Sequence, residues 1–488
     1  MNRRKAIKVI PLTAVCMSKL IRKAHSTGES SYSADNSTEP LAIQYTKKVR
    51  ERLTWIRENQ AENLMEAAYA IARTFQNGGR CFQDSWDAGH SEADSWPGRN
   101  GEPEIFSFGY NMNEAGDGDL ILTCSTLGNK EFIDHIKEKN IFVIAQPSSW
   151  SGDVQYPEFL RDEVRALTLR NHADIWIENQ ATSLGGLVYV PGMPAPIGPV
   201  SGVVGKTTIW MMLADVCRIL ARRGISVPVK GDEPKITEDI IKHKRSRGEA
   251  GWVNLNNPLM DNYFDVAMRQ IELIGAELGT IRKIAKMAVD TKLDGGTIWG
   301  YSLHYSISGE ADTRRSGLAI TRKIEGASFD NNKREWVYAN MDRFDKNFKG
   351  TSKDCVIMGI TKPDDEIDLM FLDLFKKRGM KTASLGPMTR NIEVPQGRTV
   401  YKETDLHAGR MCDTYGLFAI PGFDQRICPT SGVLLDQLFW STMMEVVEQY
   451  IERTGGDVPG VFYTAALKGG VEWMIRMNAM YKFDPLIK

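Results

Sequence analysis

The sequence lacks three features that would assign it to common functional classes: an excess of basic charge, closely paired cysteines and a long apolar run. Its 61 Lys and Arg residues are balanced by 62 Asp and Glu residues, giving a net charge of −1. This balance excludes the basic surface on which an electrostatic nucleic-acid binder depends. We interpret the one basic run, Lys242–Arg247, as a solvated linker.

The seven cysteines and seven histidines are dispersed along the chain. No two cysteines have the Cys-x-x-Cys spacing of a zinc site or a redox pair. We therefore expect neither a metal nor a cofactor.

The N-terminus pairs Arg3 and Arg4 with a short apolar run that contains Lys8. This run is too short to span a bilayer, so we expect no stable membrane span. Residues 1–40 resemble a twin-arginine export signal followed by a polar linker, although a clean Ala-x-Ala cleavage site is missing. The alternative is a disordered basic tail on a cytoplasmic protein. Export to the periplasm would favour an unphosphorylated small-molecule ligand.

One stretch, "GPVSGVVGKTTIW" (Gly198–Trp210), ends like a phosphate-binding P-loop. A P-loop needs a glycine five residues before the glycine of Gly-Lys-Thr, because that length lets the backbone amides wrap the phosphates. Val200 occupies that position, so we predict that Lys206 binds no nucleotide and lies in or near the start of a helix.

The same block occurs again later in the chain. Ile197–Trp210 and Ile427–Trp440 share Ile, Pro, Ser-Gly-Val and the closing Trp without a gap, while Asp436 replaces Lys206. A shared phosphate role could not tolerate this charge reversal. The block instead predicts a repeated helix start, with Ser201 and Ser431 at the N-terminus of a buried helix.

Two further pairs of blocks repeat in the same order. Gly78–Asp94 parallels Gly295–Asp312: each follows an amphipathic helix, opens with Gly-Gly and ends in Glu-Ala-Asp. Gly118–Pro147 parallels Lys353–Pro387 as strand, tight loop, helix and strand, the pattern of a parallel βαβ unit. The chain is therefore predicted to be a tandem duplication, with copies at residues 41–235 and 263–488 joined by a linker at 236–262.

These blocks resemble the sugar isomerase (SIS) fold, and the first copy resembles an uncharacterised bacterial group of sugar isomerase domain proteins. The resemblance is carried by four segments, namely Ala88–Ser91, Ser125–Gly128, "ADIWIEN" (Ala173–Asn179) and "ARRGISVPV" (Ala221–Val229). It implies two tandem flavodoxin-like three-layer α/β/α domains with mostly parallel sheets. SIS domains commonly pair, so the resemblance implies an intrachain pseudo-dimer, with a higher homo-oligomer left open.

The resemblance also implies where a sugar or sugar phosphate binds. In this fold the ligand lies at the carboxyl ends of the parallel strands. The implied contacts to a phosphate are Ser85, Ser91, Ser125, Thr126 and Gly128, with Ser201 a further candidate. The alternative is that these residues only cap helices and close turns.

Aldose–ketose isomerisation needs ring opening and a proton shuttle between adjacent carbons. The implied groups are His90 for ring opening and Glu92 as the base. Against this, His90 could be a hydrogen-bonding loop residue, and Glu92 a first-turn carboxylate favoured by the helix dipole.

Two departures from the family pattern bear on function. Leu127 replaces a second serine in the first copy, and the matching loop of the second copy, Gly359–Glu366, carries a proline and three acids. An acidic loop should repel phosphate, so we expect the second copy to serve as a packing partner. Two functions remain: a sugar-phosphate isomerase, or a related etherase or lyase, acting from the first copy, and a non-catalytic sugar-binding or regulatory protein.

Overall fold

The computed structural model describes most of the chain between residues 38 and 462. The described ranges are 38–84, 101–125, 128–147, 168–179, 186–193, 196–231, 235–237, 241, 252–303, 307, 310–311, 317–324, 334–360, 362–389, 395–410, 412 and 416–462. The signal-like segment and the basic run Lys242–Arg247 lie outside them.

The first half of the chain forms one parallel sheet after a long helix. Helix α2 (Leu41–Gln76) leads into the sheet, whose strand order is β3-β1-β4-β5-β6. Helix α3 (Lys130–Glu138) connects β4 to β5, which confirms the predicted βαβ unit. The strands are β1 (Cys81–Asp84), β3 (Phe106–Phe108), β4 (Leu120–Thr123), β5 (Phe142–Ala145) and β6 (Ile175–Trp176).

The second half repeats this arrangement. Its sheet has the order β11-β10-β12-β13-β14, again parallel throughout. The strands are β10 (Ile298–Ser302), β11 (Thr321–Lys323), β12 (Cys355–Gly359), β13 (Lys381–Leu385) and β14 (Leu406–Ala408). The helices are α7 (Met260–Leu273), η3 (Ile274–Glu277), α8 (Leu278–Leu293), α10 (Arg334–Asn347), α11 (Glu366–Lys377) and α12 (Val400–Glu403).

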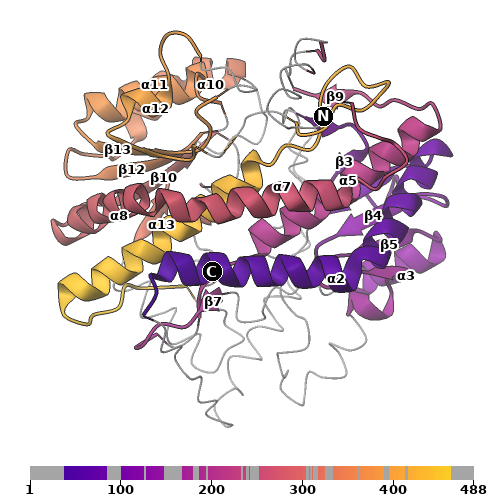
Figure 1. Ribbon diagram of the computed structural model, residues 1–488, viewed down its shortest axis with the longest axis horizontal. Coiled ribbons are helices and arrows are strands. Elements are labelled where there is room, and N and C mark those ends of the chain that lie inside the picture. Colours follow the sequence, from indigo (N-terminus) through magenta and orange to yellow (C-terminus); the bar gives the residue numbers. More distant parts are fainter. Residues whose placement is uncertain are drawn as a thin grey trace, which may run out of the picture.

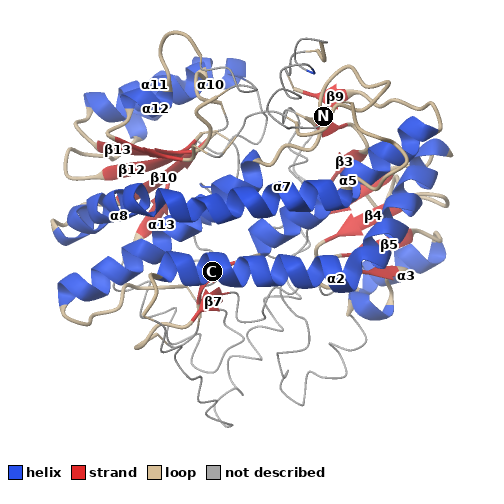
Figure 2. Ribbon diagram, viewed as in Figure 1, coloured by secondary structure: helices blue, strands red, loops and turns tan. Residues whose placement is uncertain are grey.

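Numbered by chain position within each half, both sheets have the order 2-1-3-4-5. This is the flavodoxin-like order of doubly wound α/β folds, and helices flank both sheets (Figure 2). The predicted fold class, two tandem three-layer α/β/α domains, is confirmed. Small additional elements, which the repeats did not predict, are η2 (Leu169–Asn171) and the antiparallel pairs β2 (Glu102–Pro103) with β9 (Val229–Lys230) and β7 (Gly186–Val188) with β8 (Ile197–Pro199).

A layer of long helices lies between the two sheets (Figure 1). Its core is α5 (Ser201–Arg222) and α13 (Ser431–Thr454), the two helices that begin at the repeated Ser-Gly-Val. Every residue from Ser201 to Leu220 is buried, and so is every residue from Ser431 to Val447. Helices that are apolar nearly all round belong inside a protein, so the prediction of two buried helices is confirmed.

Matching contacts show why the Gly-Gly blocks repeat. Gly78 and Gly295 have φ of +79° and +80°, a conformation that favours glycine as each helix ends. A Cβ on Gly79 would lie 2.2 Å from the Gly118 carbonyl oxygen, and one on Gly296 would lie 2.2 Å from that of Lys353. Both positions therefore require glycine for close backbone approach.

The two copies also cap each other's first helix. In α5 the fully buried Asp215 accepts a hydrogen bond of 2.9 Å from the Met260 amide at the start of α7. In α13 the fully buried Glu445 accepts one of 3.4 Å from the Ala42 amide at the start of α2. These residues occupy matching places in the two copies, so the exchange of caps fits a pseudo-twofold relation between the halves.

At the centre of this helical layer, Lys206 pairs with its own repeat counterpart. The Lys206 Nζ atom lies 2.7 Å from Asp436 Oδ2, and the two side chains are 1% and 0% exposed. Lys206 is an interior residue of α5, as predicted for a helix start that only resembles a P-loop. The charge reversal between the repeats therefore supplies the two halves of one buried ion pair.

Removing one partner of this pair should destabilise the protein strongly. Lys206→Met leaves the Asp436 carboxylate buried without its cation, which should lower the free energy of unfolding by about 3–5 kcal/mol. The double variant Lys206→Met/Asp436→Leu should recover most of that loss, because it removes both charges. Urea unfolding followed by circular dichroism measures both effects.

The control is the exposed ion pair between Lys286 and Asp290, whose atoms lie 2.7 Å apart. Lys286→Met should change the free energy of unfolding by less than about 1 kcal/mol. A Lys206→Met variant as stable as this control would contradict the assigned importance of the buried pair.

A second prediction concerns His407 in β14, whose Nδ1 lies 2.9 Å from Ser384 Oγ. Burial, helped by the nearby Arg410 cation, lowers the His407 pKa to about 4 from its usual 6.5. The unfolded chain thus takes up a proton first, so stability should fall as the pH drops from about 6.5 to 4, by about 2–3 kcal/mol. Comparing unfolding at pH 7 and pH 4 for the wild type and His407→Gln tests this. An equal loss in both proteins would exclude His407 as the cause.

Candidate functional site

The strand order places a topological switch point between β1 and β4. The chain leaves β1 toward β3 on one side and later returns as β4 on the other, with Asp84 opposite Thr123 in the register. In open α/β sheets, ligands bind in the crevice at the carboxyl ends of two such strands. The carboxyl ends of β1 and β4 therefore lie side by side at this edge of the sheet.

Three of the predicted ligand contacts lie within the described residues. Ser125 lies two residues after the end of β4 and is buried, and its amide donates to Thr123 Oγ1 at 3.1 Å. Ser201 is the first residue of α5 and is also buried. Gly128 precedes Asn129, the cap of α3. The other predicted residues lie outside the described residues, namely Ser85, His90, Ser91, Glu92 and Thr126.

Gly128 is tightly packed against side chains of α3 and η2. A Cβ at this position would lie 3.1 Å from side-chain atoms of Phe132, Ile133 and Leu169, closer than ordinary van der Waals contact. The neighbouring Asn129 side chain accepts a hydrogen bond of 2.7 Å from the Phe132 amide. The end of this loop is therefore anchored on the first turn of α3 by a neutral cap.

The corresponding loop of the second copy is closed by its own carboxylates. Asp365 is buried and caps α11, accepting from the Ile367 amide at 2.9 Å and the Asp368 amide at 3.4 Å. Asp368 in turn accepts a hydrogen bond of 2.9 Å from the buried Tyr301 hydroxyl. An anion at this helix start would face a fixed negative charge where the first copy has neutral Asn129.

Sequence comparison did not single out two buried glutamines near the switch point, Gln83 in β1 and Gln146 directly after β5. Gln146 Nε2 donates to the Gly205 carbonyl oxygen at 3.4 Å, which links the end of the sheet to α5. The sequence feature that could have marked both residues is a glutamine at the end of a short strand that begins with apolar residues. Its meaning depends on burial, which sequence alone does not give.

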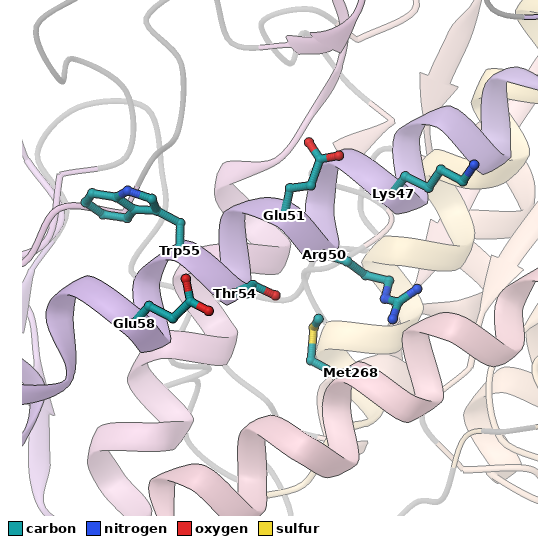
Figure 3. A pocket seen from close by; sticks show the side chains of 7 residues that line it. All are labelled: Lys47, Arg50, Glu51, Thr54, Trp55, Glu58 and Met268. Atoms are coloured by element: carbon teal, nitrogen blue, oxygen red, sulfur yellow. The ribbon is translucent and has the colours of Figure 1, made fainter.

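A surface hollow of about 490 Å³ lies elsewhere, along the outward face of α2 (Figure 3). Six of its lining residues come from α2 and one, Met268, comes from α7. Its charged side chains are of both signs: Lys47, Arg50, Glu51 and Glu58. None of the described residues that line it belongs to a strand or to a loop that follows a strand.

Neither a metal-binding cluster nor an exposed thiol occurs among the described residues. They contain no group of His, Cys, Asp and Glu side chains arranged to hold a metal ion. All six cysteines among the described residues are buried. For example, burial, with a contribution from the Asp119 carboxylate, raises the Cys81 pKa to about 12, so this thiol is not a nucleophile near neutral pH. No helix in the described ranges is long and apolar enough to cross a membrane.

Comparison with known proteins gives one sequence relative and several structural ones. No family model matches the chain. A protein of Streptomyces griseus described as "UPF0309 protein" is 25% identical over 229 residues, covering 40% of this chain and 88% of its own.

The solved structures to which the chain is similar span most of both halves. A putative sugar binding protein from Salmonella typhimurium LT2 is 11% identical with a TM-score of 0.43, over 83% of this chain and 98% of its own. A putative phosphosugar isomerase from Clostridium difficile 630 is 9% identical with a TM-score of 0.44, over 86% and 99%. Tagatose-6-phosphate ketose/aldose isomerase from Escherichia coli is 11% identical with a TM-score of 0.37, over 88% and 97%. The assignment of fold rests on the strand order described above.

Proposed function

We propose that the first copy, residues 41–235, binds a sugar or sugar phosphate at the carboxyl edge of β1 and β4. The observation that carries this proposal is the switch point between these strands, with Ser125 two residues after the end of β4. The solved structures that span both halves, described as sugar-binding or phosphosugar isomerase proteins, agree with this ligand class.

In this proposal, hydroxyls and backbone amides hold the phosphate or the hydroxyls of the ligand. Ser125, Thr126 and Gly128 act from the loop after β4, and Ser201 acts from the start of α5. Ser85 and Ser91 act from the segment after β1. A helix start such as that of α5 favours an anionic group through its unpaired amides.

The second copy, residues 263–488, has a supporting role. Its buried Asp365 carboxylate already accepts the first amides of α11. It packs against the first copy through α13 and does not bind an anionic sugar.

Aldose–ketose isomerisation is the proposed reaction, with His90 opening the sugar ring and Glu92 moving the proton between adjacent carbons. Etherase or lyase chemistry on a sugar phosphate, also acting from the first copy, is the related alternative. The second candidate function is non-catalytic sugar binding, which fits a chain in which one of two copies has lost its anion site.

Ser125→Ala tests the binding site. A panel of hexoses and hexose phosphates is first screened by thermal shift, and binding is then measured by calorimetry. The variant should weaken binding by about 0.5–1.5 kcal/mol, or more if the hydroxyl contacts a charged phosphate. Asp365→Ala is the control in the second copy: it should lower stability by about 1 kcal/mol through loss of a cap and leave affinity unchanged. The reverse pattern would assign the site to the wrong copy.

Glu92→Gln separates catalysis from binding. If Glu92 is the base, this variant should still bind the ligand, but turnover should fall by a factor of about 100 or more. Interconversion of the aldose and ketose, followed by nuclear magnetic resonance, measures turnover. A wild-type protein that binds a sugar without converting it would favour the non-catalytic function.

A further inference from the structure

Gln83 places an unpaired amide in the interior of the first copy. It is the third residue of β1, and its side chain is fully buried. Neither Oε1 nor Nε2 has a hydrogen-bond partner among the described residues. A buried polar group without a partner is unfavourable and rare in native proteins, so it calls for a physical reason such as a bound water or ligand.

The register shows which way this amide faces. Gln83 lies opposite Leu122 of β4, and Leu122 lies opposite Ile144 of β5. Leu122 and Ile144 pack in the same core as the apolar residues of α5, so this face of the sheet looks toward that helix. Gln146, two residues beyond Ile144, faces the same way, as its contact with the Gly205 carbonyl shows. Its Oε1 atom also has no partner among the described residues.

The second copy closes the corresponding place with apolar groups. The strand pairing is the same in both copies, and it places Gly300 of β10 at the position of Gln83 in β1. A Cβ on Gly300 would lie 2.4 Å from the Ala311 Cβ, so this position has no room for a side chain. The strand pairing also places the buried Leu385 where the first copy has Gln146.

Helices α5 and α13 differ in the same way, with a glycine in the first copy and a large apolar side chain in the second. Leu435, buried in α13, is the counterpart of Gly205 in α5. No described atom lies within 4 Å of the position that a Cβ on Gly205 would take. The first copy therefore keeps two amides and a glycine at the switch point, where the second copy is packed with apolar side chains.

We propose that Gln83, assisted by Gln146, binds hydroxyl groups of the sugar part of the ligand. A primary amide both donates and accepts, as a sugar hydroxyl does, and it carries no charge with which to select a phosphate. Gln83 lies in β1 at the switch point itself, and Gln146 approaches from the far side of β4. The inference rests on the proposed function, because it assigns the hydroxyl-binding part of the same site.

The test is Gln83→Met, which keeps the volume of the side chain and removes its amide. Because the described residues leave this amide unpaired, the variant should have an unchanged or higher Tm in the absence of ligand. Its affinity for glucose 6-phosphate or fructose 6-phosphate should fall about 3- to 10-fold, while its affinity for inorganic phosphate stays the same. Differential scanning calorimetry and titration calorimetry measure the two effects.

Gln437 in α13 provides the matched control. It is equally buried, but its Nε2 atom donates to Thr46 Oγ1 at 3.2 Å and to Ser441 Oγ at 3.4 Å. Gln437→Met should therefore lower the Tm and leave the affinity for each probe unchanged.

Two results would overturn the inference while the proposed function stands. One is a loss of Tm in Gln83→Met as large as that in Gln437→Met, which would show that the Gln83 amide is paired within the protein. The other is an unchanged affinity for both hexose phosphates, which would leave the amide a water-binding role. If wild-type protein binds neither hexose phosphate nor glucose nor fructose, the proposed function fails, and this inference fails with it.

Discussion

The structure depends on the packing of α5 against α13, with the Lys206–Asp436 ion pair between them. A charge and its countercharge can face each other across a pseudo-twofold relation only if the two copies differ at that residue. Two first copies would bring Lys206 against Lys206, and two second copies would bring Asp436 against Asp436. A buried pair of this kind adds little net stability, but it penalises pairings that leave a charge without its partner. The replacement of Lys206 by Asp436 in the second copy thus favours pairing of a first copy with a second copy over pairing of two identical copies.

Many other features follow from this arrangement. The buried carboxylates of Asp215 and Glu445 reach across to cap the helix that opens the opposite copy, so neither copy completes its own helical layer. Each half therefore depends on the other for hydrogen bonds as well as for burial. The second copy therefore has a structural role that does not depend on ligand binding, because its Glu445 caps the first helix of the first copy.

Much of the fold could be predicted from the order of the repeated blocks. Gly78 and Gly295 both have a positive φ, and Ser201 and Ser431 begin equivalent helices in the two copies. The short pairs β2–β9 and β7–β8 could not be predicted, because they join segments distant in sequence without a strong pattern. The opposite charges of Lys206 and Asp436 were evidence against a P-loop, but their mutual contact depends on tertiary packing. At the site, serines and glycines stood out by type, whereas Gln83 became notable only through burial without a partner.

The two copies have diverged in opposite directions from one plan. In the second, the strand ends are sealed by Leu385 and Leu435, and the helix start is neutralised by Asp365. In the first, the same places hold Gln146, Gly205 and the neutral Asn129. Apolar packing and satisfied caps favour stability, whereas an unpaired amide at a switch point costs stability and is available to a ligand. The apolar packing of the second copy thus contrasts with the first copy, where the described residues leave the Gln83 amide unpaired.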